Sequence, residues 1–174
     1  MGPLQTEHLP EWVGNALTSE MGLLVLFVLA VLEGAMLLRF MPSELLVPAA
    51  IALVGHAAPV VVAIVLVAVV GTTIGQAVLF VVVRRGGREY VLTRDWIPVD
   101  ADQLARFDGW FERWGLLAVP VSNTLLFVRG LMTFPAGLSG MRLGTFVSLS
   151  ALGSLCFQSI LAALYLAGRR VIVL

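Results

Sequence analysis

Residues 57–83, AAPVVVAIVLVAVVGTTIGQAVLFVVV, contain no charged side chain. A helix rises about 1.5 Å per residue and the hydrocarbon layer of a bilayer is about 30 Å thick, so this run can cross a membrane with some tilt. Arg84, Arg85 and Arg88 follow it directly. Because arginines cluster on the cytoplasmic side of a span, the sequence predicts a transmembrane helix with residues 84–115 inside the cell.

The composition also indicates a membrane protein. Of the 174 residues, 59% are apolar and 13% are charged, whereas an ordinary soluble domain carries about 25% charged residues. The eleven basic residues are balanced by eleven acidic ones, so net charge gives no argument for a nucleic-acid partner. We expect one all-α polytopic membrane domain over residues 21–174. Residues 1–20 hold three glutamates and no arginine, unlike a signal peptide, and are expected to be a retained polar tail.

Two further apolar runs have the length of a membrane span. Residues 21–38 are interrupted only by Glu33 and have about the minimum length for a crossing. Residues 143–167 form the last predicted span, whose serines and glutamine can bond to neighbouring helices. Arg169 and Arg170 follow it, and we expect them to put the C-terminus on the cytoplasmic side too.

Two other apolar stretches, residues 39–55 and 116–140, are interrupted by proline, glycine and charge. Proline removes a backbone donor and strains a continuing helix, so we expect each stretch to enter the membrane as a re-entrant hairpin. The residues that break or shape the hairpins are Arg39, Pro42 and Ser43 in the first and Asn123, Gly130, Pro135 and Gly137 in the second.

The two broken stretches share a short pattern, Pro48-Ala49-Ala50-Ile51 in the first and Pro135-Ala136-Gly137-Leu138 in the second. Paired interrupted segments in two halves of a chain are typical of inverted-repeat transporters, whose binding site lies where the halves meet. Four matched residue types also arise by chance. The inverted repeat is therefore a hypothesis.

The polar stretch between the halves carries one helical signal. Asp100 and Gln103 form a capping-box pattern, apolar residues recur at helical spacing up to Trp114, and Gly115 follows as a C-cap. This predicts an amphipathic helix. Trp110 and Trp114 suit the headgroup level of a bilayer, and a loop helix packed on the protein is an equal alternative.

Three charged side chains fall inside apolar segments. Glu33 lies about 18 Å into its run, Glu44 follows the first proline break, and Arg129 lies within the second broken stretch. An arginine at mid-membrane costs about 2.5 to 3.5 kcal/mol on insertion scales, so it needs a partner or a purpose. The three charges can form an anion site, a proton relay, or a buried network that only holds helices together. An interfacial position for Glu44 is a further alternative.

The sequence lacks the motifs of the common hydrolases and metal enzymes, such as H-E-x-x-H, G-x-S-x-G or paired cysteines. We expect no catalytic residue, no metal and no cofactor. Gly71 and Gly75 have the spacing of a close helix contact and are assigned to packing. Cys156 lies in an apolar run and is expected to be a buried structural thiol.

These features together resemble the DedA family, also called the SNARE-associated Golgi or VTT-domain family, over residues 33–168. Its E…P-G-E/D signature resembles Glu33…Pro42-Ser43-Glu44, and its glycine helix resembles Gly71…Gly75 before Arg84-Arg85-Gly86-Gly87. Its R-x-x-P-x-x-R region, with the A-G, M and F positions downstream, resembles Phe111…Gly115…Arg129…Pro135-Ala136-Gly137…Met141…Phe146.

The resemblance implies two re-entrant hairpins among spanning helices. It also implies lipid transport, because members move undecaprenyl phosphate or other phospholipids across bilayers, and proton coupling is ascribed to some. The chain departs from the pattern at four positions, where Asn123 replaces the first arginine, Leu126 the intervening proline, Gln76 an aspartate and Ser43 a glycine.

We therefore expect a multi-pass flippase or scramblase of the cell membrane that moves a phosphate-bearing lipid. Arg129 would hold the phosphate with its fork of donors, while Glu33 and Glu44 exchange protons. A non-transporting assembly or membrane-integrity factor, or a small ion or proton transporter, stays an alternative. Membrane lipids are the expected partners, nucleic acid is not, and the sequence leaves homo-oligomerisation open.

Overall fold

The computed structural model describes residues 21–38, 43–94, 97, 99–125 and 129–173, and these residues form helices and connections without a strand. The predicted all-helical fold class is confirmed. The predictions for Arg39, Pro42, Leu126 and the tail fall outside the described residues. In chain order the elements are α2 (Gly22–Gly34), the 3-10 turn η1 (Ser43–Leu45), α3 (Leu46–Val54), α4 (Ala58–Thr93), α5 (Ala101–Trp114), the 3-10 turn η2 (Gly115–Leu117), α6 (Ala118–Thr124), α7 (Thr133–Leu138) and α8 (Leu143–Val173).

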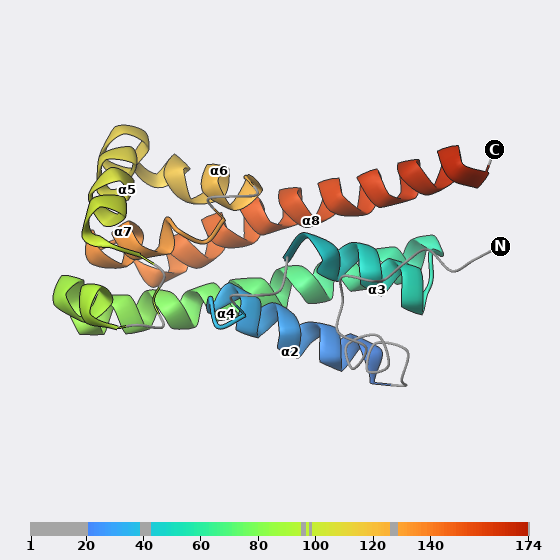
Figure 1. The fold of residues 1–174 in the computed structure, drawn as a ribbon, viewed down its shortest axis with the longest axis horizontal. Coiled ribbons are helices and arrows are strands. Elements are labelled where there is room, and N and C mark those ends of the chain that lie inside the picture. Colours follow the sequence, from blue (N-terminus) through green and yellow to red (C-terminus); the bar gives the residue numbers. More distant parts are fainter. Residues whose placement is uncertain (1–20, 39–42, 95–96, 98, 126–128, 174) are drawn as a thin grey trace.

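Helices α4 and α8 form a long antiparallel pair (Figure 1). Both are long and apolar enough to cross a membrane. Helix α4 carries a proline in its first turn, where the missing N–H has no helical partner to lose. It runs on to Thr93, and Gly87 interrupts it with a positive φ of 74°. The Arg84 cluster therefore lies on a helix and not in a loop.

The two arginine clusters lie at opposite ends of this pair. Arg84 donates to the carbonyl of Met141, just before α8 begins, at 2.9 Å. Arg169 Nη1 lies 3.1 Å from Nδ1 of His56, just before α4 begins. Arg169 therefore lies at the opposite end of the pair from the Arg84 cluster, which argues against the prediction that Arg169 and Arg170 share the cytoplasmic side with that cluster. Because the two long helices pack antiparallel, their C-terminal ends lie at opposite ends of the pair, whichever charges follow them.

Helices α2 and α3 form a hairpin beside the N-terminal half of α4. Figure 1 shows α2 running from one end of the molecule to its middle and α3 returning to that end. Helix α2 ends at Gly34, and Met36 turns the chain with a φ of 59°. The prediction of a full span over residues 21–38 is wrong, because 13 helical residues rise only about 20 Å.

Helices α6 and α7 form the second interrupted segment, at the other end of the molecule. Figure 1 shows α6 running inward from the end where α5 lies, and α7 lying back toward that end. The second stretch is an interrupted helix, as predicted. In the first, the described residues 43–55 form η1 and the continuous helix α3, so the hairpin there pairs α3 with α2 and is not contained in residues 39–55 as predicted. The two breaks approach each other from opposite ends of the α4–α8 pair.

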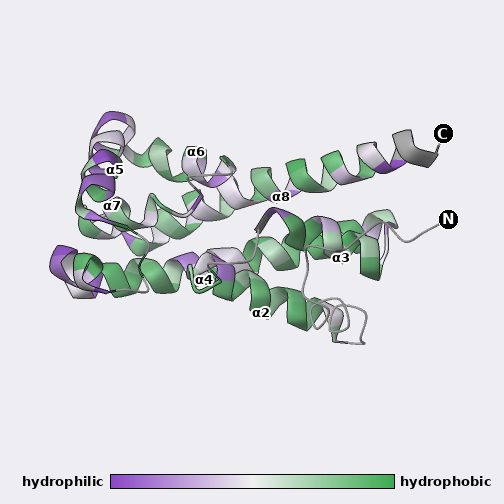
Figure 2. Ribbon diagram, viewed as in Figure 1, coloured by the Kyte–Doolittle hydropathy of each residue, from purple (hydrophilic) through white to green (hydrophobic). Residues whose placement is uncertain are grey.

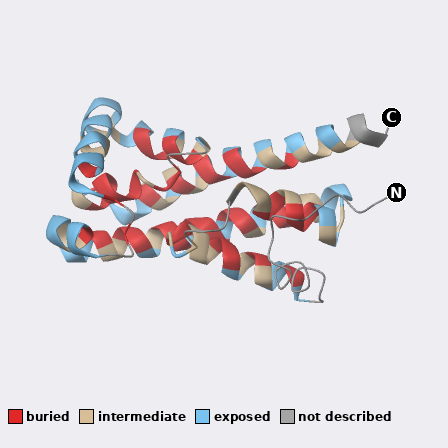
Figure 3. Cartoon of the chain, viewed as in Figure 1, coloured by how far each residue is buried: buried red, intermediate tan, exposed pale blue. Residues whose placement is uncertain are grey.

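Helix α5 lies across the end that holds α7 and the C-terminal part of α4 (Figure 1). Its predicted capping box is confirmed, since the Gln103 N–H donates to Asp100 Oδ1 at 2.7 Å and the Asp100 N–H donates to Gln103 Oε1 at 3.2 Å. Hydrophilic residues gather on α5 and on the nearby end of α4 (Figure 2), and these parts are also exposed (Figure 3). Leu104 is the one buried residue of α5, while Phe107 and Phe111 are partly buried against the neighbouring apolar clusters.

Buried apolar side chains form layers along the α4–α8 pair. The first layer joins α2, α3 and Ile64–Val69 of α4 to Ala162 of α8. The other layers lie further along α4, around residues 79–83, and include the stacked rings of Phe80 and Phe146 at 4.5 Å. Cys156 is exposed on α8, so its predicted burial is wrong. An apolar run in a membrane protein need not face inward.

Candidate functional site

Between the apolar layers, the breaks of the two interrupted segments meet at an ion pair. Arg129 Nη1 lies 3.3 Å from Oε1 of Glu33, and the two side chains are 4% and 12% exposed. Glu33 is at the end of α2 and Arg129 precedes α7. A Cβ placed on Gly130 would lie 3.2 Å from the Met36 methyl carbon, so the side chain of Met36 also reaches the Gly130 backbone here. The fold therefore joins two predicted site residues that are far apart in the sequence.

Thr72 of α4 links the two charges. Its hydroxyl donates to Glu33 Oε2 at 3.1 Å and accepts from Arg129 Nη2 at 3.3 Å. On another side, the Arg129 guanidinium carbon lies 4.3 Å from the centre of the Phe157 ring of α8, within cation–π range. Contacts from α2, α4 and α8 thus fix the guanidinium.

Arg129 retains unused hydrogen-bonding capacity. A guanidinium has five N–H donors, and Nε and Nη1 of Arg129 are buried without a hydrogen-bond partner among the described residues, although Nη1 is close to the Glu33 carboxylate. A planar fork with free donors matches the oxygens of a phosphate or carboxylate. The arrangement can therefore accept an anionic group.

Four other predicted residues lie in two places, Ser43 and Glu44 in η1 and Pro135 and Gly137 in α7. Glu44, in the 3-10 turn η1 before α3, is partly buried and its charge acts on both Glu33 and Arg129. Ser43 opens the same 3-10 turn. Pro135 and Gly137 are buried in α7 and shape its packing: a Cβ on Gly137 would meet Val83 of α4 at 2.9 Å.

Gln76 and Asn123, two positions that depart from the resembled pattern, bond to each other. The Gln76 side-chain N–H donates to Asn123 Oδ1, and the Asn123 side-chain N–H donates to Gln76 Oε1, both at 3.0 Å. Asn123 also donates to Ser150 Oγ at 3.1 Å and accepts from the Gly130 N–H at 3.0 Å, while Ser150 donates to Gln76. This buried amide cluster holds the residue beside Arg129 against α4 and α8.

Sequence reasoning treated Gln76 as a departure and Asn123 as a departure that also shapes the second hairpin, and it missed their pairing. A signal was present, because Gln76 is an amide in a charge-free span, where such a group needs a partner. Nothing in one sequence indicates which of the polar residues on the other helices that partner is.

Gly71 and Gly75 lie against α2. A Cβ on Gly71 would lie 2.8 Å from the Phe27 carbonyl oxygen, and a Cβ on Gly75 would lie 2.1 Å from that of Val31. A side chain at either position would push α2 away. The close approach of α2 to α4 is what brings Glu33 to Thr72.

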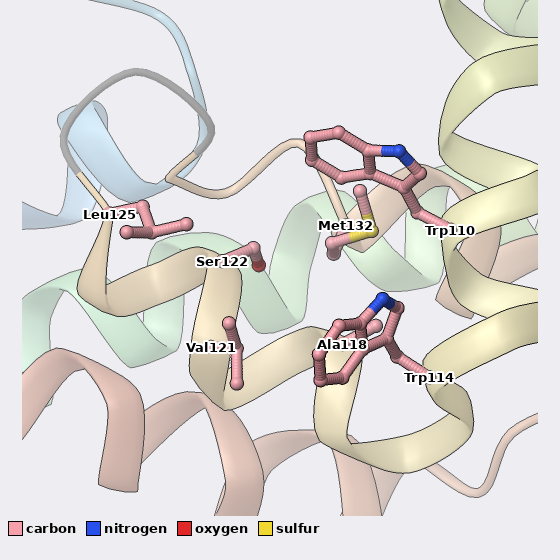
Figure 4. A pocket seen from close by; sticks show the side chains of 7 residues that line it. All are labelled: Trp110, Trp114, Ala118, Val121, Ser122, Leu125 and Met132. Carbon is pink, nitrogen blue, oxygen red and sulfur yellow. The ribbon is translucent and has the colours of Figure 1, made fainter.

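An apolar pocket of about 220 Å³ opens between α5 and α6 (Figure 4). Trp110 and Trp114 of α5 face it from one side, and Val121 and Leu125 of α6 from another (Figure 4). The lining residues are Trp110, Trp114, Ala118, Val121, Ser122, Leu125 and Met132. The three charged residues do not line it, so it is separate from the ion pair.

Comparison with known proteins identifies the family. The model of the VTT domain matches residues 41–166. The chain belongs to the VTT-domain family. It is therefore a membrane protein, and the resemblance to the DedA family is confirmed. A curated relative, undecaprenyl phosphate transporter A of Staphylococcus aureus, is 26% identical over 141 residues, which cover 78% of this chain and 68% of the relative. The search of solved structures found no match.

Proposed function

We propose that this protein is a multi-pass lipid transporter of the cell membrane, a flippase or scramblase for a lipid that carries a phosphate. The observation that carries the proposal is the buried Arg129, whose free donors lie beside Glu33 where two broken segments meet. Membership of the VTT-domain family and the relative named as an undecaprenyl phosphate transporter support it.

The α2–α3 and α6–α7 segments act, in this proposal, as two re-entrant hairpins that enter the bilayer from opposite sides. Their opposite directions along α4 and α8 (Figure 1) support an inverted repeat. Backbone breaks at membrane depth are tolerated where protein or a cavity surrounds them, and such breaks line the binding sites of inverted-repeat transporters. The pair of Glu33 and Arg129 then lies near the midplane.

The arrangement of layers supports alternating access. Along α4, apolar residues 64–69 come first, the polar Thr72, Thr73 and Gln76 follow, and apolar residues 79–83 come next. A phosphate would reach Arg129 from one side when one apolar layer opens, and leave when the other opens. Glu33, together with Glu44, would take up or release a proton as the anion arrives, because two anions compete for one guanidinium.

Seven arginines lie at the α5 end of the molecule, and we infer that this end faces the cytoplasm. They are Arg84, Arg85, Arg88, Arg94, Arg106, Arg113 and Arg142. The C-terminus of α8 would then lie on the outer side. Trp110 and Trp114 would lie at the cytoplasmic headgroup level, where their pocket suits part of a hydrocarbon tail.

Reconstitution into vesicles with a fluorescent polyprenyl phosphate or phospholipid tests the function. Arg129→Lys should slow translocation about tenfold or more, the factor that corresponds to about 1.4 kcal/mol, since an ammonium cannot copy the fork. Glu33→Gln should remove any pH dependence. Arg85→Lys is the matched control, because Arg85 is exposed at the end of α4.

Unchanged translocation in both Arg129→Lys and Glu33→Gln at several pH values would contradict this mechanism. If the wild-type protein moved no lipid, the ion pair would instead be a structural link between the hairpins, as in an assembly factor. In that case Arg129→Gln should lower the unfolding temperature, because removing one member of a buried pair leaves the other charge uncompensated.

A further inference from the structure

One face of α8 carries three polar side chains four residues apart, Ser150, Ser154 and Gln158. Residues at this spacing lie one above the other on a helix. All three are buried, with 0%, 0% and 2% of their surfaces exposed. Ser150 belongs to the amide cluster, whereas Ser154 Oγ and Gln158 Oε1 have no hydrogen-bond partner among the described residues. Thr73 Oγ1 of α4 is likewise buried without a hydrogen-bond partner among the described residues.

The register of the helices brings this face to Arg129. Because α4 and α8 are antiparallel and Ser150 bonds to Gln76, Ser154, one turn along α8, falls level with Thr72, one turn back along α4. Thr72 accepts a hydrogen bond from Arg129. Phe157, whose ring lies under the guanidinium, is the residue before Gln158. Ser154 and Gln158 therefore belong to the turn of α8 that carries Phe157, the residue in contact with the guanidinium.

Unpaired buried polar groups lower stability, and an apolar side chain of similar size would remove that cost. The helix carries apolar residues elsewhere on its buried surface, such as Phe146 and Ala162. Two buried, unpaired groups on the turn of α8 that holds the guanidinium of an arginine with free donors thus indicate a ligand and not a packing contact. A hydroxyl can donate to a phosphate oxygen, and an amide oxygen can accept from a P–OH group.

We propose that Ser154 and Gln158 form the α8 half of the phosphate site, with Ser154 donating to an unprotonated oxygen and Gln158 accepting from the hydroxyl of a singly protonated phosphate monoester. The inference rests on the proposed lipid transport and specifies its substrate class. A choline phosphodiester has no hydrogen-bond donor in its headgroup, so Gln158 gives the site a preference for monoesters.

The test uses full-length protein in vesicles with a fluorescent polyprenyl phosphate or a fluorescent phosphatidylcholine. Gln158→Leu, and Gln158→Met as a second variant of similar length, should slow translocation of the monoester about tenfold and leave phosphatidylcholine unaffected. Ser154→Ala should slow the monoester less. Ser148→Ala is the control, because Ser148 is exposed on α8 and donates only to the Gly144 carbonyl among its described contacts.

Unfolding temperature separates a binding role from a structural one. Removing an unpaired buried group should keep or raise it, whereas removing a structural contact should lower it. Monoester rates within about twofold of wild type in folded variants, or lower unfolding temperatures that account for the lost activity, would overturn the inference. If Arg129→Lys impaired transport and the α8 variants did not, this inference alone would fail, while an inactive wild type would remove the proposed function itself.

Inorganic phosphate distinguishes a lipid-borne group from the free anion. If inorganic phosphate inhibits transport by the wild-type protein but not by the Gln158→Leu variant, the result supports a site that binds both free and lipid-borne phosphate. Transport that is insensitive to inorganic phosphate but sensitive to Gln158→Leu supports a site for the lipid-borne phosphate alone.

Discussion

The pair formed by Gln76 and Asn123 permits a quantitative test of how the second hairpin is held. The perturbation is Asn123→Ala, which removes one carboxamide. Four hydrogen bonds go with it: two to Gln76, one to Ser150 and one from the Gly130 N–H. Gln76 keeps only its contact from Ser150, and the Gly130 N–H loses its side-chain acceptor.

Hydrogen bonds between helices in a membrane protein average about 0.6 kcal/mol in double-mutant cycles. Loss of four such bonds should lower the free energy of unfolding by about 2 kcal/mol. The two reciprocal amide bonds should give a coupling energy of about 1 kcal/mol between Gln76 and Asn123 in a full cycle with Gln76→Ala. Transport should fall as well, because Gly130 adjoins Arg129.

Reversible unfolding in mixed micelles measures the four free energies of this cycle. The resembled family carries an aspartate and an arginine at the positions of these two amides. The double variant with Gln76→Asp and Asn123→Arg should therefore regain the stability that each single variant loses. A coupling energy below about 0.3 kcal/mol, within the additivity expected of independent sites, would refute the reasoning, as would a double exchange no better than the worse single variant.

Two further predictions concern packing and topology. Gly75→Ala should destabilise the protein by about 2 kcal/mol in the same unfolding assay, because its Cβ would meet the Val31 carbonyl at 2.1 Å; Gly144→Ala, whose Cβ meets nothing within 4 Å, is the control, and equal effects would contradict the packing argument. A reporter inserted near Asp100 should read as internal and one fused after α8 as external, since Arg84 and Arg169 lie at opposite ends of the α4–α8 pair; two reporters on the same side would contradict the arrangement.

The sequence by itself determined the helical class, the two long helices, the capped helix at Asp100 and the breaks in the two apolar stretches. These features depend on local properties, namely the length of an apolar run, the missing N–H of proline and the side-chain oxygen of a cap. It also singled out Glu33 and Arg129, because a charge in an apolar segment is costly wherever the segment lies.

Only the tertiary structure decided how these parts combine. The prediction of a full span over residues 21–38 did not hold, since an apolar run does not specify where a helix stops and turns. The end of the molecule at which Arg169 lies depended on antiparallel packing of α4 and α8, which no residue near Arg169 encodes. The ion pair and the bonds between side chains of the amide cluster join residues from 27 to 96 positions apart. Contacts at that separation depend on which helix faces meet, so the pattern of one segment cannot reveal its partner.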